Sequence, residues 1–266
     1  MARVSVKIEN HIAQVTLTRA DKMNALDSDM IDAIIEAGES LIDNADVRVV
    51  VLSGDGGAFC AGLDVMSFAA MAAQDPEEIA MPRTHGNANR FQQVAMVWRK
   101  IPVPVIAALH GVVFGGGFQI SLGVDIRIAA PGTKMSIMEM KWGLIPDMGG
   151  MVLLPHLTRS DVIRKLTYTA TPILAEQAET WGLVTELADD PLAAAMDLAE
   201  QISHKSPSAI RTAKQLISYA EENIADPDAV LLEESRVQVA LIGKPHQMEV
   251  IAANLQKRLP VFKTAT

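Results

Sequence analysis

The sequence predicts an α/β protein that ends in a helical region. Segments with the two-residue period of strands alternate with segments of helical period up to about residue 190, and only helical periods follow. Two of the expected strands end in glycine-rich stretches, at 54–64 and 110–119. We therefore expect an α/β core over residues 1–190. We expect a helical oligomerisation region over residues 191–266, because a tail with so many apolar positions favours packing on a second chain.

The N-terminal segment predicts a hairpin, a helix and a buried strand. Residues 4–17 alternate apolar and polar side chains around a turn at Asn10, which is the pattern of a hairpin. Residues 27–42 carry one apolar stripe at helical spacing, with Ser28 as a candidate cap. The run VRVVVLSG at 47–54 predicts a buried strand that a glycine-rich turn closes.

The middle of the chain continues the alternation, and the C-terminal part is helical. Residues 66–90 lack a clear period, and we expect a helix and a mobile loop there. The next expected elements are a helix at 90–101, a strand at 103–113, a helix opened by a glycine turn at 114–124, and a strand at 125–130. Proline and glycine punctuate four C-terminal amphipathic helices, at 191–205, 206–222, 229–243 and 246–259.

Composition argues against several functional classes. The chain has 266 residues and a formal net charge of -9 without a block of Lys and Arg, so nucleic acid is not an expected partner. Cys60 is the single cysteine, which excludes an intrachain disulfide and fits a reducing cytosol. No signal-peptide core and no membrane-spanning apolar run occur, so we expect a cytoplasmic protein without membrane contacts. No two histidines lie at ligand spacing, so no metal is expected.

The two glycine-rich stretches are candidates for an oxyanion hole. Glycine lets a ligand approach main-chain N–H groups, and two such turns that face one pocket aim two N–H groups at one oxygen. A helix starting just after Gly117 would add its N-terminal partial positive charge. Taken singly, each stretch is better explained as a tight turn. No dinucleotide fingerprint, P-loop or nucleophile elbow accompanies them, and the apolar context of Cys60 favours an inert buried thiol.

The segment MEMKWGLIPDMGG at 138–150 holds two acids beside core-type residues. Glu139 and Asp147 bracket its apolar run, and such acids need a partner or a task. The pair is a candidate for proton transfer, although Asp147 also suits the cap of a helix beginning near Gly149. The methionines nearby are expected in the core or along a flexible apolar tunnel: Met135, Met138, Met140, Met148 and Met151.

Six segments of the chain resemble the enoyl-CoA hydratase/isomerase family, the crotonase superfamily. The resemblance covers nearly the whole chain, and its segments are ADKMNAL at 20–26, FCAGLD at 59–64, HGVVFGGGFQISLGVDIRIAA at 110–130, MEMKWGLIPDMGG at 138–150, AEQAETWGLVTEL at 175–187 and ISHKSPSAIRTAK at 202–214. It implies a spiral of ββα units with a C-terminal trimerisation region, assembled as a homotrimer or as a hexamer of paired trimers. It also implies an acyl-CoA thioester substrate and no cofactor beyond the coenzyme A that the substrate carries.

The resemblance implies roles for individual residues. In the family, two backbone N–H groups bind the thioester oxygen and stabilise an enolate, and they correspond here to Leu63 and Gly116. Preorganised donors of this kind are worth on the order of 3 kcal/mol each. Phe262 and Lys263 resemble a terminal pair that reaches the coenzyme A of a neighbouring subunit. The other positions that correspond to coenzyme A contacts are Lys22, Ala25, Ala61, Gly62, Leu63 and Asp64.

The acids distinguish two branches of the family. Hydratases of the family use two glutamates, and the later one corresponds to Glu139. The earlier one falls on Gln119, which is neither acid nor base but can hydrogen-bond a water or substrate. Dienoyl-CoA isomerases pair the later glutamate with an aspartate, which corresponds to Asp147. Those isomerases usually carry an aspartate at the position of Gln119, so this residue departs from both patterns.

We therefore expect double-bond isomerisation of a (di)enoyl-CoA, in which Asp147 takes the proton from C2 and Glu139 serves the distal carbon. One alternative is a 2-enoyl-CoA hydratase that uses Glu139, with Gln119 positioning the water. Another is a non-catalytic acyl-CoA-binding or RNA-binding member of the family, although the absence of a Lys/Arg cluster argues against RNA.

Overall fold

The main sheet has the architecture that the alternating periods predict. The computed structural model describes residues 2–67 and 73–263 of the chain. In the described residues, six strands pair in the order β1-β2-β3-β4-β6-β9, with β1 antiparallel to β2 and the others parallel. The inner strands are buried along nearly their whole length, because helices cover both faces. The strands are β1 (Val4–Glu9), β2 (Ile12–Leu17), β3 (Val49–Gly54), β4 (Val105–Leu109), β6 (Ile126–Ala129) and β9 (Glu186–Leu187).

A smaller second sheet joins the two glycine-rich stretches. It consists of β5 (Val112–Phe114), β7 (Lys134–Ser136) and β8 (Ile173–Leu174). Cys60 extends this sheet through a parallel bridge to Val113. The N–H of Cys60 donates to the oxygen of Val112 over 3.2 Å, and the N–H of Phe114 donates to the oxygen of Cys60 over 3.0 Å. The turn that follows β3 therefore lies beside the turn that follows β5.

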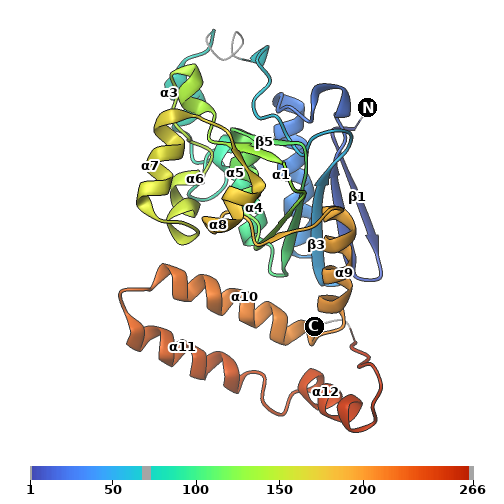
Figure 1. Ribbon diagram of the computed structural model, residues 1–266. Coiled ribbons are helices and arrows are strands. Elements are labelled where there is room, and N and C mark those ends of the chain that lie inside the picture. The colour runs from blue at the N-terminus through green and yellow to red at the C-terminus, as the bar shows by residue number, and fades with distance from the viewer. Residues whose placement is uncertain (1, 68–72, 264–266) are drawn as a thin grey trace.

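Helices cover the main sheet on both faces (Figure 1). α1 (Ser28–Ile42) and α4 (Arg90–Lys100) pack together over one core, and α9 (Pro191–Ser203) closes a second core on the other face. The cap of α1 is Asp27, which accepts the N–H of Met30 over 2.8 Å. The prediction of Ser28 as the cap was therefore wrong by one residue, because Ser28 is already helical.

Short helices connect the strands around the smaller sheet. The expected helix within 66–90 is α3, and residues 68–72 lie outside the described residues. These connecting helices are η1 (Ala20–Lys22), α3 (Pro76–Ala80), α5 (Gly116–Leu122), η2 (Glu139–Trp142), α6 (Gly150–Leu153), η3 (Leu154–His156), α7 (Ser160–Thr169) and α8 (Ala175–Thr180).

The helical C-terminal region is confirmed, with a helix in each expected segment. Each helix begins with a proline at its first position, where the missing N–H costs nothing. Figure 1 shows three of these helices gathered below the rest of the molecule, whereas α9 packs on the sheet. The three are α10 (Pro207–Glu222), α11 (Pro227–Val239) and α12 (Pro245–Leu255). None of the helices in the described part of the chain combines the length and apolar character needed to cross a bilayer.

Asn24 fastens the η1 segment to the turn after β3. It is fully buried and adopts a positive φ of 54°. Its amide nitrogen donates to the oxygens of Asp55 and Ala58 over 3.0 and 2.9 Å, and its amide oxygen accepts the N–H of Arg19 over 2.9 Å. Three backbone groups thus depend on one buried side chain.

We expect Asn24→Ala to lower the free energy of unfolding by about 3 kcal/mol, because it removes three hydrogen bonds made by a buried side chain. Urea denaturation measures this loss. Asn10→Ala is the matched control, since Asn10 has a similar positive φ of 50° in an exposed turn. Equal losses in both variants would attribute the effect to backbone strain instead of the hydrogen bonds.

Candidate active site

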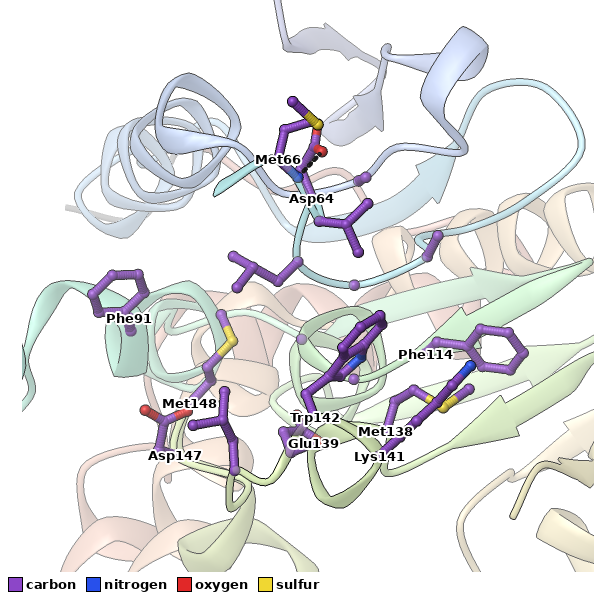
Figure 2. A pocket seen from close by; sticks show the side chains of 18 of the residues that line it. Asp64, Met66, Phe91, Phe114, Met138, Glu139, Lys141, Trp142, Asp147 and Met148 are labelled. Carbon is purple, nitrogen blue, oxygen red and sulfur yellow. Dashed lines mark hydrogen bonds between the residues drawn. The ribbon is translucent and has the colours of Figure 1, made fainter. Parts of the chain in front are cut away.

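A cavity of about 580 Å³ opens between the two glycine-rich turns and the segment that carries Glu139 and Asp147. Figure 2 shows the two acids on one side of this cavity, opposite the loop that carries Asp64 and Met66. Apart from the acids and the nearby lysines, the lining is mainly apolar. It includes the side chains of Leu63, Met66, Phe91, Phe114, Met138, Trp142 and Met148.

Leu63 and Gly116 reach the same cavity because each follows the bridge between Cys60 and Val113 by three residues. A Cβ atom built on Gly62 would lie 2.7 Å from the oxygen of Phe114 and 3.5 Å from the nitrogen of Gly116. Only glycine permits this approach, and its φ of 87° is also one that other residues rarely adopt.

Both backbone N–H groups are available to a ligand. α5 begins at Gly116, so this N–H has no acceptor within its own helix. Leu26 bonds to the residues on either side of Leu63: its N–H donates to the oxygen of Gly62, and its oxygen accepts the N–H of Asp64. Among the described residues, the N–H groups of Leu63 and Gly116 have no assigned acceptor. Two free donors at one cavity are suited to binding a single anionic oxygen.

Arg19 anchors the turn at residues 61–64 through its contact with Asp64. No role for Arg19 at this site was predicted from the sequence. Its guanidinium lies 2.8 Å from a carboxylate oxygen of Asp64 and donates to the oxygen of Ala25 over 2.9 Å. The N–H of Met66 and the Arg19 guanidinium lower the pKa of Asp64, so this carboxylate is ionised. Asp64 thus anchors the turn and is unsuited to donate a proton near neutral pH.

Glu139 begins η2 and is held in a largely desolvated position. The amide nitrogen of Gln119 donates to its Oε1 over 2.6 Å. Its Oε2 is buried and has no hydrogen-bond partner in the described part of the chain. Burial raises the pKa of Glu139, and the negative charge of Asp147 raises it further against the opposing effect of the Gln119 hydrogen bond.

Asp147 lines the cavity and does not cap the following helix. α6 begins at Gly150 and its cap is Gly149, and the side chain of Asp147 makes no capping hydrogen bond to this helix. The alternative prediction of Asp147 as a helix cap is therefore wrong. Its side chain keeps solvent-accessible surface along the cavity, yet the protein around it removes enough water to raise the pKa of Asp147.

Gln119 contacts Glu139 but does not line the cavity. Its side chain is 1% exposed on α5. Its amide oxygen accepts the backbone N–H groups of Met148 and Gly150 over 2.9 and 3.0 Å. Gln119, which departs from both family patterns, therefore links Glu139 to the loop that carries Asp147.

The residues expected to contact coenzyme A fall into two groups. Phe262 packs on Arg48 and His246, with its ring 5.6 Å from the guanidinium carbon and 5.3 Å from the imidazole centre. Lys263 follows it, and its backbone oxygen lies 3.1 Å from Nε2 of His246. Neither residue lines the cavity of its own chain. The other group does line it, and comprises Lys22, Ala25, Ala61, Gly62, Leu63 and Asp64.

The sequence marked some of the apolar lining and missed the rest. Of the methionines noted as a possible tunnel, Met138 and Met148 line the cavity, whereas Met135 is buried in the core. Phe91 and Trp142 also line it, although no local pattern distinguished them from ordinary core or surface residues. Among the residues that the structure describes, no cluster of His, Cys, Asp and Glu is placed to hold a metal ion.

Comparisons with known proteins agree with the fold. Residues 7–265 match the enoyl-CoA hydratase/isomerase family. The chain is 32% identical over 225 residues to the mitochondrial Delta(3,5)-Delta(2,4)-dienoyl-CoA isomerase of Rattus norvegicus, covering 82% of this chain and 69% of the relative. It is 32% identical over 260 residues to 1,2-epoxyphenylacetyl-CoA isomerase of Escherichia coli, covering 96% of each.

A comparison with solved structures shows the same fold in an enoyl-CoA hydratase. The crystal structure of an enoyl-CoA hydratase from Bacillus anthracis superposes with a TM-score of 0.88 at 28% sequence identity, covering 99% of this chain and 100% of that one. The family match spans nearly the whole chain, and the fold agrees over nearly the same length. This protein therefore belongs to the enoyl-CoA hydratase/isomerase family.

Proposed function

We propose that the protein isomerises a 3,5-dienoyl-CoA to the conjugated 2,4-dienoyl-CoA. The observation that carries this proposal is that Asp147, which does not cap α6, lines one cavity with Glu139 and with Leu63 and Gly116, whose N–H groups have no acceptor in the described part of the chain. The similarity to a dienoyl-CoA isomerase supports the same reaction. The proposed chemistry needs no cofactor beyond the coenzyme A of the substrate.

The proposed reaction moves one proton along the acyl chain. Asp147 removes a proton from C2, and the electron pair of that C–H bond delocalises onto the thioester oxygen. The N–H groups of Leu63 and Gly116 stabilise the resulting enolate. Glu139 then donates a proton to C6 as the double bonds shift to C2 and C4. One proton leaves C2 and one arrives at C6, so substrate and product have the same composition.

The electrostatics of the pair suit these roles. The negative charge of Asp147 raises the pKa of Glu139, so Glu139 is the group that carries the proton when the pair holds only one. An ionised Asp147 is a competent base, and a neutral Glu139 is a competent acid. Each turnover leaves Asp147 protonated and Glu139 ionised. Both residues keep solvent-accessible surface, so Asp147 releases its proton to water and Glu139 regains one from water before the next turnover.

Hydration of a 2-enoyl-CoA is the second candidate, because structural relatives such as the Bacillus anthracis protein are named enoyl-CoA hydratases. Glu139 would then act on a water molecule that Gln119 positions. The burial of Gln119 and the use of its amide oxygen by two backbone N–H groups favour isomerisation over this candidate.

We propose that the coenzyme A moiety lies along the cavity edge formed by Lys22, Ala25 and the 61–64 turn. Phe262 and Lys263 would contact the coenzyme A of a neighbouring copy. We also propose a homotrimer, alone or paired into a hexamer, because α11 and α12 expose apolar side chains that a monomer leaves in water. They include Leu231, Leu232, Val239, Met248, Ile251 and Leu255, each between 43% and 81% exposed.

We expect wild-type protein to convert 3,5-dienoyl-CoA to a product with the absorbance of a conjugated dienoyl thioester. In deuterated water the product should carry deuterium at C6. Glu139→Gln and Asp147→Asn should each lower kcat by about 10²- to 10⁴-fold, as expected for the loss of a general acid or base.

A parallel assay with 2-enoyl-CoA distinguishes the candidates. Loss of enoyl absorbance without dienoyl turnover would make the protein a hydratase. Binding of both thioesters with no turnover would support the passive acyl-CoA-binding alternative. Asp147→Gly should abolish isomerisation and spare any hydration.

We expect Glu139→Gln to raise the Tm at about pH 8 and to leave it unchanged at about pH 4. Burial raises the pKa of Glu139 above its ordinary value of 4.5. The penalty for the buried charge is absent below that value and appears as the pH rises through the pKa of the folded state. Thermal unfolding across this range measures the difference, and an identical gain at both pH values would attribute it to something other than ionisation.

Glu249→Gln is a control of opposite sign. Its hydrogen bonds with Arg258 and the N–H of Val261 lower the pKa of Glu249 to about 2. This variant should therefore lower the Tm at neutral pH, and the loss should disappear as acid protonates the wild-type carboxylate.

We expect the double variant Leu231→Lys/Leu232→Lys to dissociate the proposed oligomer, because charged side chains oppose burial of this apolar face. Size-exclusion chromatography with light scattering measures the mass. Gln238→Lys adds a charge at an exposed polar position of the same helix and should leave the assembly intact. A wild-type chain that is already monomeric would contradict the proposed trimer.

A further inference from the structure

The contacts of the Gln119 side chain fix the orientation of its amide group. Backbone N–H groups only donate hydrogen bonds, so the amide atom that faces Met148 and Gly150 has to be the oxygen. The amide nitrogen then faces Glu139 and donates to its Oε1 over 2.6 Å. Rotating the amide by half a turn would place a donor against two donors in a site that water does not reach.

This orientation makes the two oxygens of Glu139 inequivalent. Oε1 accepts a hydrogen bond from Gln119, whereas Oε2 is buried with no partner among the described residues. In a neutral carboxyl group the unprotonated oxygen is the stronger acceptor. The proton of a neutral Glu139 is therefore more stable on Oε2, while Oε1 keeps its bond to the amide.

We propose that Gln119 is a positioning residue that holds the exchangeable proton of Glu139 on Oε2, the oxygen with no partner among the described residues. This inference rests on the proposed role of Glu139 as the acid of the reaction. Gln119 acts through Glu139 and does not touch the substrate, since it is buried behind the cavity wall. It also links the acid to the base, because its oxygen anchors the loop directly after Asp147.

A neutral side chain at this position also limits the negative charge around Glu139. The charged residues that line the same cavity are Asp21, Lys22, Asp64, Lys141 and Asp147. Of these, Asp147 is the one whose charge raises the pKa of Glu139. A carboxylate in place of Gln119 would add a second negative charge within hydrogen-bond distance and would compete for the proton.

Gln119→Glu separates the two functions of the amide. It keeps an oxygen that accepts the N–H groups of Met148 and Gly150 and replaces only the nitrogen that donates to Glu139. Near neutral pH, the introduced carboxyl group and Glu139 would share one proton across the former hydrogen bond, which leaves Oε2 of Glu139 without a proton. Gln119→Met is the comparison variant, because it removes the donor and the acceptor together.

We expect Gln119→Glu to lower kcat for the dienoyl substrate by about tenfold or more at neutral pH, with little change in KM. Its pH optimum should move to lower pH by about one unit or more, because a second proton restores the donor to Glu139. Gln119→Met should lower the Tm as well as kcat. A Gln119→Glu enzyme with the wild-type kcat and pH profile would overturn the proposal, as would a loss of kcat that is uniform with pH.

A second measurement needs no turnover and separates this inference from the proposed function. Carbon NMR of protein labelled at glutamate side-chain carboxyl groups follows the titration of Glu139, assigned with Glu139→Gln. We expect the apparent pKa of Glu139 to change in Gln119→Glu by about one unit or more. An unchanged titration would contradict the positioning role. A changed titration in a protein without isomerase activity would contradict only the proposed reaction.

Discussion

The parallel pairing of Cys60 with Val113 is the contact on which the rest of the site depends. Because the two segments run parallel from this bridge, Leu63 and Gly116 each follow it by three residues and line one cavity from separate turns. The approach is close enough that side chains are excluded. A Cβ atom on Gly117 would lie 2.6 Å from the Cβ of Cys60. A backbone donor left without a partner costs about 1–3 kcal/mol, and the well-buried sheet and helices around the site offset that cost.

Asp64, Glu139 and Asp147 all line the cavity, and their surroundings give these carboxyl groups different properties. Asp64 has a guanidinium and a backbone N–H as partners, so its pKa is lowered and its charge is compensated. Glu139 and Asp147 have no cation among the causes that shift them, and burial raises the pKa of both. Arg19 thus compensates the charge near the two backbone donors, whereas on the opposite wall burial favours the neutral form of both carboxyl groups.

Gln119 shows why a departure from a family pattern is best interpreted through its contacts. Its side chain satisfies two backbone N–H groups and one carboxylate oxygen, and it is almost completely buried. An amide can do this because it carries an acceptor and a donor on one planar group. A carboxylate offers only acceptors when ionised, so it would satisfy the loop and repel Glu139.

The sequence by itself determined the α/β alternation, the buried strands and the helical C-terminal region, because hydrophobic period and capping residues depend on neighbours within one or two turns. It also marked Glu139, Asp147 and both glycine-rich turns as candidates. Local sequence did not identify the capping residue of α1, because Asp27 and Ser28 are both good caps. The choice between them depends on where the chain turns into α1.

Only the tertiary structure decided what each candidate does. It showed that Asp147 does not cap α6. Gln119 forms hydrogen bonds to residues from 20 to 31 positions away, and Arg19, which follows β2, pairs with Asp64, which follows β3. The tertiary structure also located Phe262 against Arg48, far along the chain. Periodicity carries no information on such partners. A side chain's hydrogen bonds and the field that sets its pKa come from atoms that folding brings together, whatever their separation in sequence.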